Sequence, residues 1–118
     1  MTRDMDLMRA IMLDVEQQPV DALWSARPML DHNQAEVVEH VKLLQEQGLV
    51  EANCIDFVDA VIHRITNSGH DFVEAARPQT RWQKAKDRVA AQGVPLTINS
   101  IRFALDVLIK DALSHLRL

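Results

Sequence analysis

The stretch Asn33-Gln-Ala-Glu-Val-Val-Glu-His-Val-Lys-Leu-Leu-Gln-Glu-Gln-Gly-Leu-Val50 predicts one amphipathic helix that ends at a glycine and continues into a strand. Asn33 can accept a hydrogen bond from a backbone N–H of the first turn, and Glu36 can reach back to the Asn33 N–H. Apolar residues recur at helical spacing: Val37, Val38, Val41 and Leu44. Gly48 can take the left-handed conformation that ends a helix. A helix followed by strand, turn and strand is typical of the recognition helix and wing of a winged helix-turn-helix domain.

Further elements are predicted on both sides of this stretch. Helices are expected over about 3–17, 66–76, 80–92 and 98–116, and strands over 49–52 and 57–66, joined by a turn at Asn53–Asp56. Thr66, Thr97 and a second capping box of Thr80 and Gln83 are expected to begin the later helices. The segment 19–32 leaves two readings open, a short helical turn or a short strand around Ala22–Trp24, because Pro28 excludes a long helix there.

These elements predict a mainly α fold with a small β-hairpin. We expect a winged helix-turn-helix-like core over 1–76 and a C-terminal helical extension over 77–118 that packs on the core, forming a single domain overall. A chain of 118 residues is long enough to bury such a core. The last helix is apolar over more than one face, which is more than a peripheral helix needs. We therefore expect a homodimer through Ile98–Leu116.

Composition places the chain among ordinary water-soluble proteins. Apolar residues make up 47% and charged residues 25% of the sequence. No stretch approaches the roughly 20 apolar residues of a membrane span, and the first residues carry acids where a secretory signal has basic and apolar residues. A lone cysteine, Cys54, excludes a disulfide within the chain. We expect a cytoplasmic protein that does not bind membranes.

The charges are distributed unevenly. Residues 1–60 carry 4 basic and 12 acidic side chains, whereas residues 61–118 carry 9 and 5. Six residues are candidates for binding nucleic acid. Gln34, Lys42 and Gln45 lie on the predicted recognition helix, and Arg81, Lys84 and Arg88 share one face of a later helix. The alternative reading of the face of Arg81, Lys84 and Arg88 is an ordinary solvated helix surface over a core Trp82. The alternative for the predicted recognition helix is a surface that contacts protein instead of DNA.

Catalytic and metal-binding patterns are weak. Five histidines (His32, His40, His63, His70 and His115) and Cys54 are the candidate ligands, but no two histidines have the spacing of a helical metal site. Glycine-rich phosphate loops are also missing from the sequence, which has three glycines. We expect no metal, no cofactor and no enzymatic activity.

Three segments together resemble a known family. They are Arg3-Asp-Met-Asp-Leu-Met-Arg9, Ile65-Thr-Asn-Ser-Gly-His-Asp-Phe-Val-Glu-Ala-Ala-Arg77 and Trp82-Gln-Lys-Ala-Lys86. They are similar to the domain-of-unknown-function family 2513, over about residues 1–92. The resemblance implies a small bacterial, phage or prophage protein with a winged-helix-like core and added C-terminal helices. The family has no established activity.

Two functions remain open at this point. The first is a non-enzymatic winged-helix regulatory module of phage or prophage type that binds double-stranded DNA. The alternative is a protein–protein interaction module, such as a phage effector that acts on a host protein complex. The acidic predicted recognition helix favours a protein partner, because carboxylates repel phosphates, whereas the basic face of Arg81, Lys84 and Arg88 favours nucleic acid.

Overall fold

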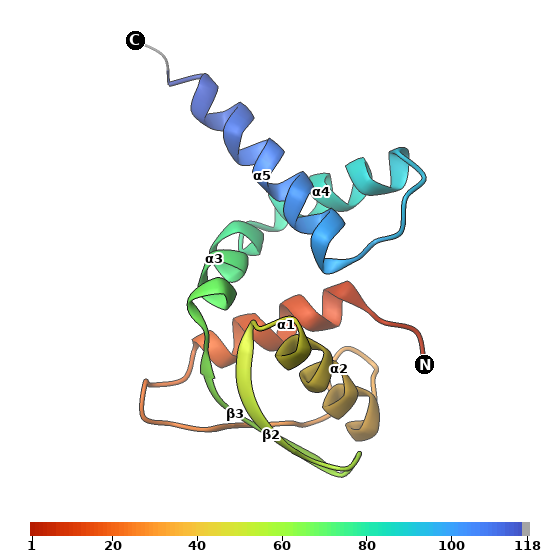
Figure 1. Cartoon of the computed structure of the whole chain (residues 1–118), viewed down its shortest axis with the longest axis vertical. Coiled ribbons are helices and arrows are strands. Elements are labelled where there is room, and N and C mark those ends of the chain that lie inside the picture. Colours follow the sequence, from red (N-terminus) through yellow and green to blue (C-terminus); the bar gives the residue numbers. More distant parts are fainter. Residues whose placement is uncertain (117–118) are drawn as a thin grey trace. The chain divides into compact units, whose positions relative to one another are not determined.

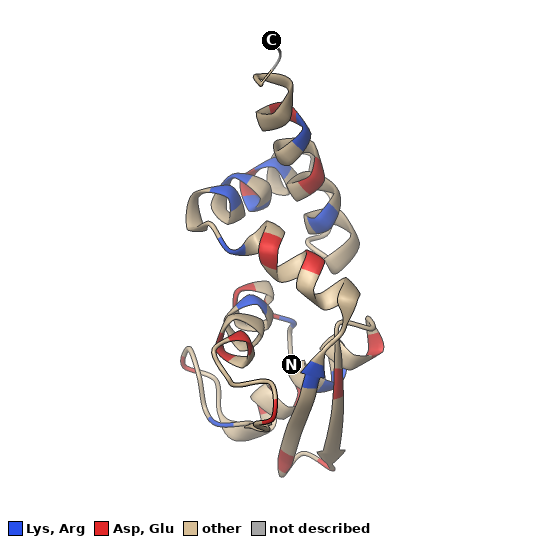
Figure 2. Cartoon of the chain, turned by 90° about the vertical axis from the view of Figure 1, so that its left-hand side faces the viewer, with Lys and Arg blue, Asp and Glu red and all other residues tan. Residues whose placement is uncertain are grey.

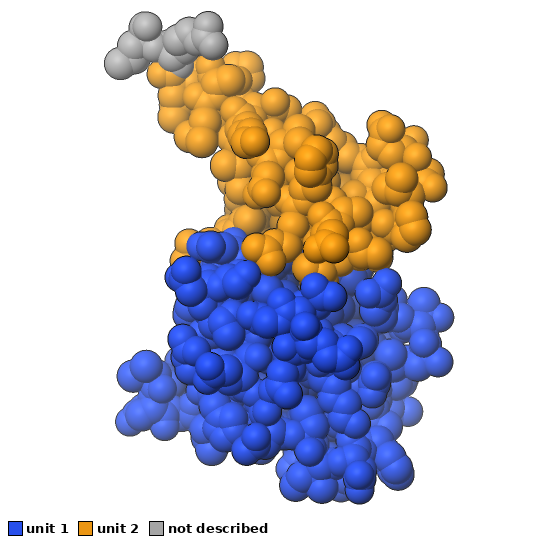
Figure 3. All heavy atoms as spheres, in the orientation of Figure 1, with its two compact units in different colours: residues 1–73 blue, residues 74–118 orange. Residues whose placement is uncertain are grey.

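In the computed structural model, which describes residues 1–116, the chain is mainly helical with one small antiparallel sheet (Figure 1). The elements in chain order are α1 (Met5–Glu16), β1 (Trp24–Ser25), α2 (Gln34–Glu46), β2 (Val50–Ile55), β3 (Asp59–Ile65), α3 (Asn67–Ala76), α4 (Gln79–Ala91) and α5 (Ile98–Ser114). The chain divides into two compact units, unit 1 of residues 1–73 and unit 2 of residues 74–118 (Figure 3). None of the described helices is both long and apolar enough to cross a membrane.

The capping signals around α2 are confirmed. The Glu36 N–H donates to Asn33 Oδ1 at 2.9 Å, and the Asn33 N–H donates to Glu36 Oε1 at 3.1 Å. Gly48 follows the end of the helix with a φ of 73°, the left-handed conformation that glycine adopts without steric cost. Local chemistry therefore sets both ends of this helix.

The core of unit 1 lies where α1, α2 and the sheet meet. Six apolar residues from these elements are all buried: Met8, Ile11, Met12, Val41, Leu44 and Ile65. Helices α1 and α2 contact each other, and both helices contact strand β3 of the sheet. Removal of these side chains from water supplies the main driving force for folding of the unit.

The sheet is larger than the predicted hairpin, because β1 adds a third strand on the far side of β3. The strand order is β1-β3-β2, with Trp24 opposite Ile62. The Trp24 indole N–H donates to Asp14 Oδ2 at 2.6 Å, which fastens β1 to α1. Of the two readings left open around Ala22–Trp24, the strand is confirmed.

Residues 17–33, all of which the structure describes, contain β1 and a tight turn but no helix. The turn closes with two backbone hydrogen bonds between Met29 and His32, and Leu30 and Asp31 at its centre have φ values of 48° and 63°. Two successive positive φ angles are the geometry of a type I′ turn. The second helix of a helix-turn-helix motif is therefore not found in front of α2.

The predicted turn at Asn53–Asp56 is wrong by two residues, because the observed turn is Ile55–Val58. Strand β2 continues to Ile55, and the Val58 N–H donates to the Ile55 carbonyl at 2.9 Å. Asp56 occupies the first central position of this turn with a φ of 47°. Phe57, expected to begin the return strand, lies in the turn instead.

In unit 2, α4 and α5 pack against each other. Trp82, Ala85 and Val89 of α4 are buried, as are Ile98, Ile101, Ala104 and Leu105 of α5. The predicted capping box of Thr80 and Gln83 is wrong, because α4 begins at Gln79 and its N-cap residue is Pro78, without a side-chain cap hydrogen bond. Thr97 caps α5 as predicted, since its Oγ1 accepts from the Ser100 N–H at 3.1 Å.

Candidate functional site

The candidate residues on α2 are engaged with the protein's own backbone. The Gln34 amide donates to the Ala26 carbonyl at 3.1 Å and to the Val58 carbonyl at 3.2 Å. The Gln45 side-chain oxygen accepts from the Ala52 N–H, next to an irregularity in the β2–β3 register. Both glutamines thus hold α2 against the β2–β3 hairpin. Reading a DNA base would require them to exchange these bonds.

Lys42, the third candidate on α2, is half-buried and lies in the electrostatic surroundings of Cys54. Burial raises the pKa of the Cys54 thiol, the Lys42 charge opposes that rise and the Glu39 charge adds to it. A raised pKa keeps the sulfur protonated at neutral pH, whereas a nucleophilic cysteine needs the thiolate. The surroundings of Cys54 therefore suit a structural thiol.

The three candidate residues on α4 share a face but differ in environment. Arg81 is half-buried, and its guanidinium donates to the Ala75 carbonyl at 3.0 Å, near the end of α3. Lys84 is exposed. Arg88 is exposed and lies 3.5 Å from the Asp111 carboxylate of α5. Helix α4 carries these three residues together with Lys86 and one acidic residue, Asp87, and Figure 2 shows basic segments along it.

Four residues form a polar network that joins the starts of α1 and α2, and we call it the N-cap cluster: Asp4, His32, Glu36 and His40. His32 lies between two carboxylates, with its ring nitrogens 2.8 Å from Asp4 Oδ2 and 3.2 Å from Glu36 Oε2. The fully buried His40 ring accepts from the Asp4 N–H at 2.9 Å and lies 2.7 Å from the Glu36 carbonyl. Asp4 and Glu36 also cap their own helices.

The spacing of residues in the sequence did not predict the N-cap cluster, although part of the cluster follows from that spacing. Glu36 and His40 are spaced at i and i+4 on one side of the predicted helix, and His32 lies just before the Asn33 cap of that helix. Asp4 lies 28 residues from His32, and that contact depends on how α1 packs on α2.

The N-cap cluster favours a charged His32. The hydrogen bond to Asp4, followed by the bond to Glu36, raises the pKa of His32 above its ordinary 6.5 against an opposing effect of burial. Burial acts to raise the pKa of Asp4, but the bond to His32 and backbone N–H donors outweigh it, so the pKa falls below 3.8. The Asn33 N–H, followed by His32, lowers the pKa of Glu36 below 4.5.

These shifts predict how stability depends on pH. The raised pKa of His32 contributes stability that is complete below pH 6.5 and is lost as pH rises through the folded value. The lowered pKa values of Asp4 and Glu36 contribute stability that is lost as pH falls below 3.8 and 4.5. The network should therefore stabilise the fold most between about pH 4.5 and 6.5.

Urea unfolding at a series of pH values tests this expectation. The wild-type midpoint should fall as pH rises from about 6 to 8, and His32→Gln should remove that fall. His63→Gln changes an exposed histidine outside the network and should keep it. A fall of the same size in His32→Gln and the wild type would contradict the assigned role of His32.

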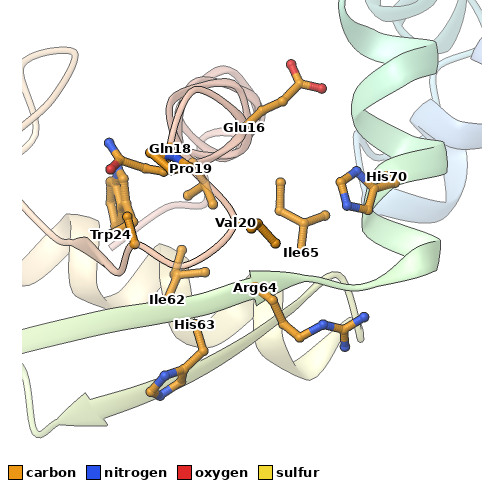
Figure 4. A pocket seen from close by; sticks show the side chains of 12 residues that line it. Glu16, Gln18, Pro19, Val20, Trp24, Ile62, His63, Arg64, Ile65 and His70 are labelled. Carbon is orange, nitrogen blue, oxygen red and sulfur yellow. The ribbon is translucent and has the colours of Figure 1, made fainter.

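The remaining histidines do not assemble into a ligand set. Over residues 1–116, no three His, Cys, Asp or Glu side chains are grouped so that they could hold a metal ion. His63 and His70 are exposed and line a cleft of about 370 Å³ beside the loop 17–23. Figure 4 shows His63 and Arg64 pointing away from that loop, whereas the buried Ile62 and Ile65 point toward it. The interior of the cleft is thus apolar.

The β2–β3 turn carries an exposed apolar cluster, which we call the apolar tip: Ile55, Phe57 and Val58. Their exposed fractions are 63%, 70% and 58%. Asp56, between the first two, holds a positive φ that a non-glycine residue rarely adopts. The sequence pattern assigned Phe57 to a strand, so it gave no sign of this surface.

Comparisons with known proteins identify the family to which the chain is similar. A family model described as "Hypothetical protein (DUF2513)" matches residues 2–95. An uncharacterized protein of Haemophilus influenzae is 28% identical over 119 residues, which cover 97% of this chain and 100% of that protein. No solved structure matches the chain significantly.

Proposed function

The chain belongs to the DUF2513 family of hypothetical proteins, and on that premise we propose that it is a non-enzymatic module of winged-helix type that binds another protein through unit 1. The order helix, strand, helix, strand, strand in unit 1 supports the winged-helix part of this proposal. In that architecture α2 corresponds to the recognition helix and the β2–β3 hairpin to the wing. The tight turn at Met29–His32 replaces the usual second helix.

The apolar tip is the observation that carries the proposal. Three neighbouring apolar side chains are each more than half exposed at the end of the hairpin. Contiguous apolar surface is uncommon on a soluble monomer and marks interaction sites when polar residues surround it. Asp56 and Asp59 lie beside the apolar side chains in sequence. Such a surface suits a protein partner that offers both apolar and basic groups.

Charge on unit 1 supports the same class of partner. Residues 1–73 carry 5 basic and 13 acidic side chains. A nucleic acid would meet strong repulsion from this unit, because affinity for phosphates depends on Lys and Arg. A basic protein surface would be attracted and steered toward it.

A nucleic-acid-binding function is the second candidate, and the face of Arg81, Lys84 and Arg88 favours it. Residues 74–118 carry 8 basic and 4 acidic side chains. In this version of the function, α4 rather than α2 contacts the phosphates, because Gln34 and Gln45 are bonded to backbone groups. Binding would then be weakly selective for sequence, since phosphate contacts carry no direct sequence information.

One pair of assays separates the two candidates. The immobilised protein should retain a protein from a lysate of its source cell, and Phe57→Asp should lose that protein specifically. Val20→Asp is the matched control, because Val20 is fully exposed in a different loop of unit 1. Retention that is unchanged in Phe57→Asp would overturn the protein-binding proposal.

The second assay measures binding of the same protein to a random-sequence DNA duplex at about 50 mM salt. We expect no binding by the wild type. If the wild type binds and a variant with Arg81, Lys84 and Arg88 all changed to Glu does not, the nucleic-acid candidate replaces the first. Each phosphate contact should then add roughly 0.9 to the slope of log affinity against log salt.

A further inference from the structure

Helix α5 carries a second face besides the one that packs on α4. Phe103, Asp106, Lys110 and Leu113 follow one another at spacings of three and four residues, and all four are exposed. Phe103 is 72% and Leu113 is 59% exposed. We call these four residues the outer stripe. Spacings of three and four residues place side chains on one side of a helix.

The outer stripe is distinct from the buried stripe of the same helix. Ile101 and Leu105 are fully buried and belong to the contact with α4. At roughly 100° of rotation per residue, the centre of the outer stripe lies about a third of a turn away from Leu105. A helix needs one apolar face to pack on its neighbour in a two-helix unit. The large apolar groups at both ends of the outer stripe are therefore additional.

We infer that the outer stripe pairs with the outer stripe of a second copy of this chain, with the two α5 helices antiparallel. A two-fold axis on the side of the outer stripe, level with position 108 along the helix, would place Phe103 of each copy opposite Leu113 of the other. The same axis places Asp106 of each copy opposite Lys110 of the other, so the dimer has two such opposite-charge contacts. The interface is thus complementary to itself, as a two-fold symmetric contact requires.

The charges of the outer stripe favour a second copy of this chain as the partner, and they favour the antiparallel arrangement of the two α5 helices. In a parallel pair, the same register would place Asp106 against Asp106 and Lys110 against Lys110. Like charges directly opposed are destabilising, whereas the antiparallel pair has two opposite-charge contacts. The four residues are ordered apolar, acidic, basic, apolar, so the reversed copy is their complement.

A groove beside the outer stripe provides a place for the end of the partner helix. It has a volume of about 590 Å³ and is lined mainly by apolar groups, among them Val89, Val94, Phe103 and Val107. Phe103 belongs both to the groove and to the outer stripe. Leu113 of the second copy, opposite Phe103, would lie at the mouth of this groove and remove apolar surface of both chains from water.

The length of the outer stripe predicts a weak dimer. Ten residues of helix between Phe103 and Leu113 span about 15 Å. A stable specific interface buries roughly 800 Å² on each partner, which is more than one such stripe supplies. We expect a dissociation constant on the order of 10–100 μM, so that dilution separates the copies. This pairing does not depend on the proposed protein or DNA ligand of the chain.

Sedimentation equilibrium of the full chain over a range of concentrations tests the pairing. The wild type should dimerise, and Asp106→Lys or Lys110→Asp alone should weaken the dimer by about tenfold or more, because each variant opposes like charges twice. An equimolar mixture of the two single variants should form a heterodimer. The double variant D106K/K110D should recover the wild-type affinity, since it exchanges the charges within each pair.

Asp111→Lys is the matched control, because it changes the charge of α5 equally but lies off the outer stripe, facing Arg88. It should dimerise like the wild type, and circular dichroism should show all variants folded. A wild type that stays monomeric up to about 1 mM would overturn the inference. A dimer whose affinity the single changes leave intact, or the double variant does not recover, would overturn this antiparallel register.

Discussion

Replacing Val41 with aspartate is expected to unfold the protein. Val41 is fully buried on α2, in the core that α1, α2 and β3 share. A carboxylate there would either lose its hydration or take up a proton, at a cost of several kcal/mol. Because small domains are stable by only about 5–15 kcal/mol, this single change should remove most of the stability.

Circular dichroism and thermal melting measure the effect of Val41→Asp. The variant should lose its cooperative transition or precipitate on expression. Lys42→Asp is the control, because it places the same side chain at the next, half-buried position and should leave the protein folded. A soluble Val41→Asp protein with a cooperative melt near that of the wild type would contradict the position of Val41 in the core.

Gly69→Ala is the second change with a large expected effect. It should destabilise the protein, although the same replacement in a helix usually stabilises. In a helix, replacing glycine with alanine ordinarily stabilises by about 1 kcal/mol. At Gly69 of α3, however, an added Cβ would lie too close to the Leu49 carbonyl oxygen, and 2.6 Å from the Ile65 Cγ2 atom. Backbone cannot yield to such a contact as a flexible side chain can.

The Leu49 carbonyl is itself part of a junction between β2 and the start of α3. It accepts from the Thr66 N–H at 3.0 Å, and Thr66 Oγ1 in turn accepts from the Gly69 N–H at 3.0 Å. Relieving the clash by moving α3 would break these bonds. We expect a loss of about 1–3 kcal/mol or more, typical of an overpacked site.

Urea and thermal unfolding measure the change in Gly69→Ala. At roughly 4 °C per kcal/mol for a chain of this size, the melting temperature should fall by about 4–12 °C. His70→Ala, an exposed neighbour on the same helix, should leave it nearly unchanged. A melting temperature of Gly69→Ala equal to or above that of the wild type would show that α3 does not approach Leu49 this closely.

The candidate interaction surfaces were only partly predictable. The sequence identified the shared face of Arg81, Lys84 and Arg88, because helical spacing alone determines it. It did not reveal that Arg81 bonds the Ala75 carbonyl or that Gln34 and Gln45 bond backbone groups. Those partners lie outside the helix that carries each side chain, so only the packed chain brings them within reach.

The sequence by itself determined the features that depend on contacts between near neighbours. The caps at Asn33, Thr66 and Thr97 each use a donor three residues further on, and Gly48 ends α2 through its own conformational freedom. The buried stripes followed from the helical period, since every apolar residue on one side must leave water together. These signals need no knowledge of the rest of the fold.

Only the tertiary structure decided which distant segments meet. Strand β1 exists because Trp24 pairs with β3 and bonds Asp14, and its two residues carry too little propensity to specify a strand alone. Phe57 is exposed because the hairpin turns at Asp56, although its apolar side chain resembles a strand residue. Asp4 meets His32 through the packing of α1 on α2. For Trp24 and Asp4 the partner is far away in sequence, and the free energy of the contact belongs to the packed fold rather than to either segment.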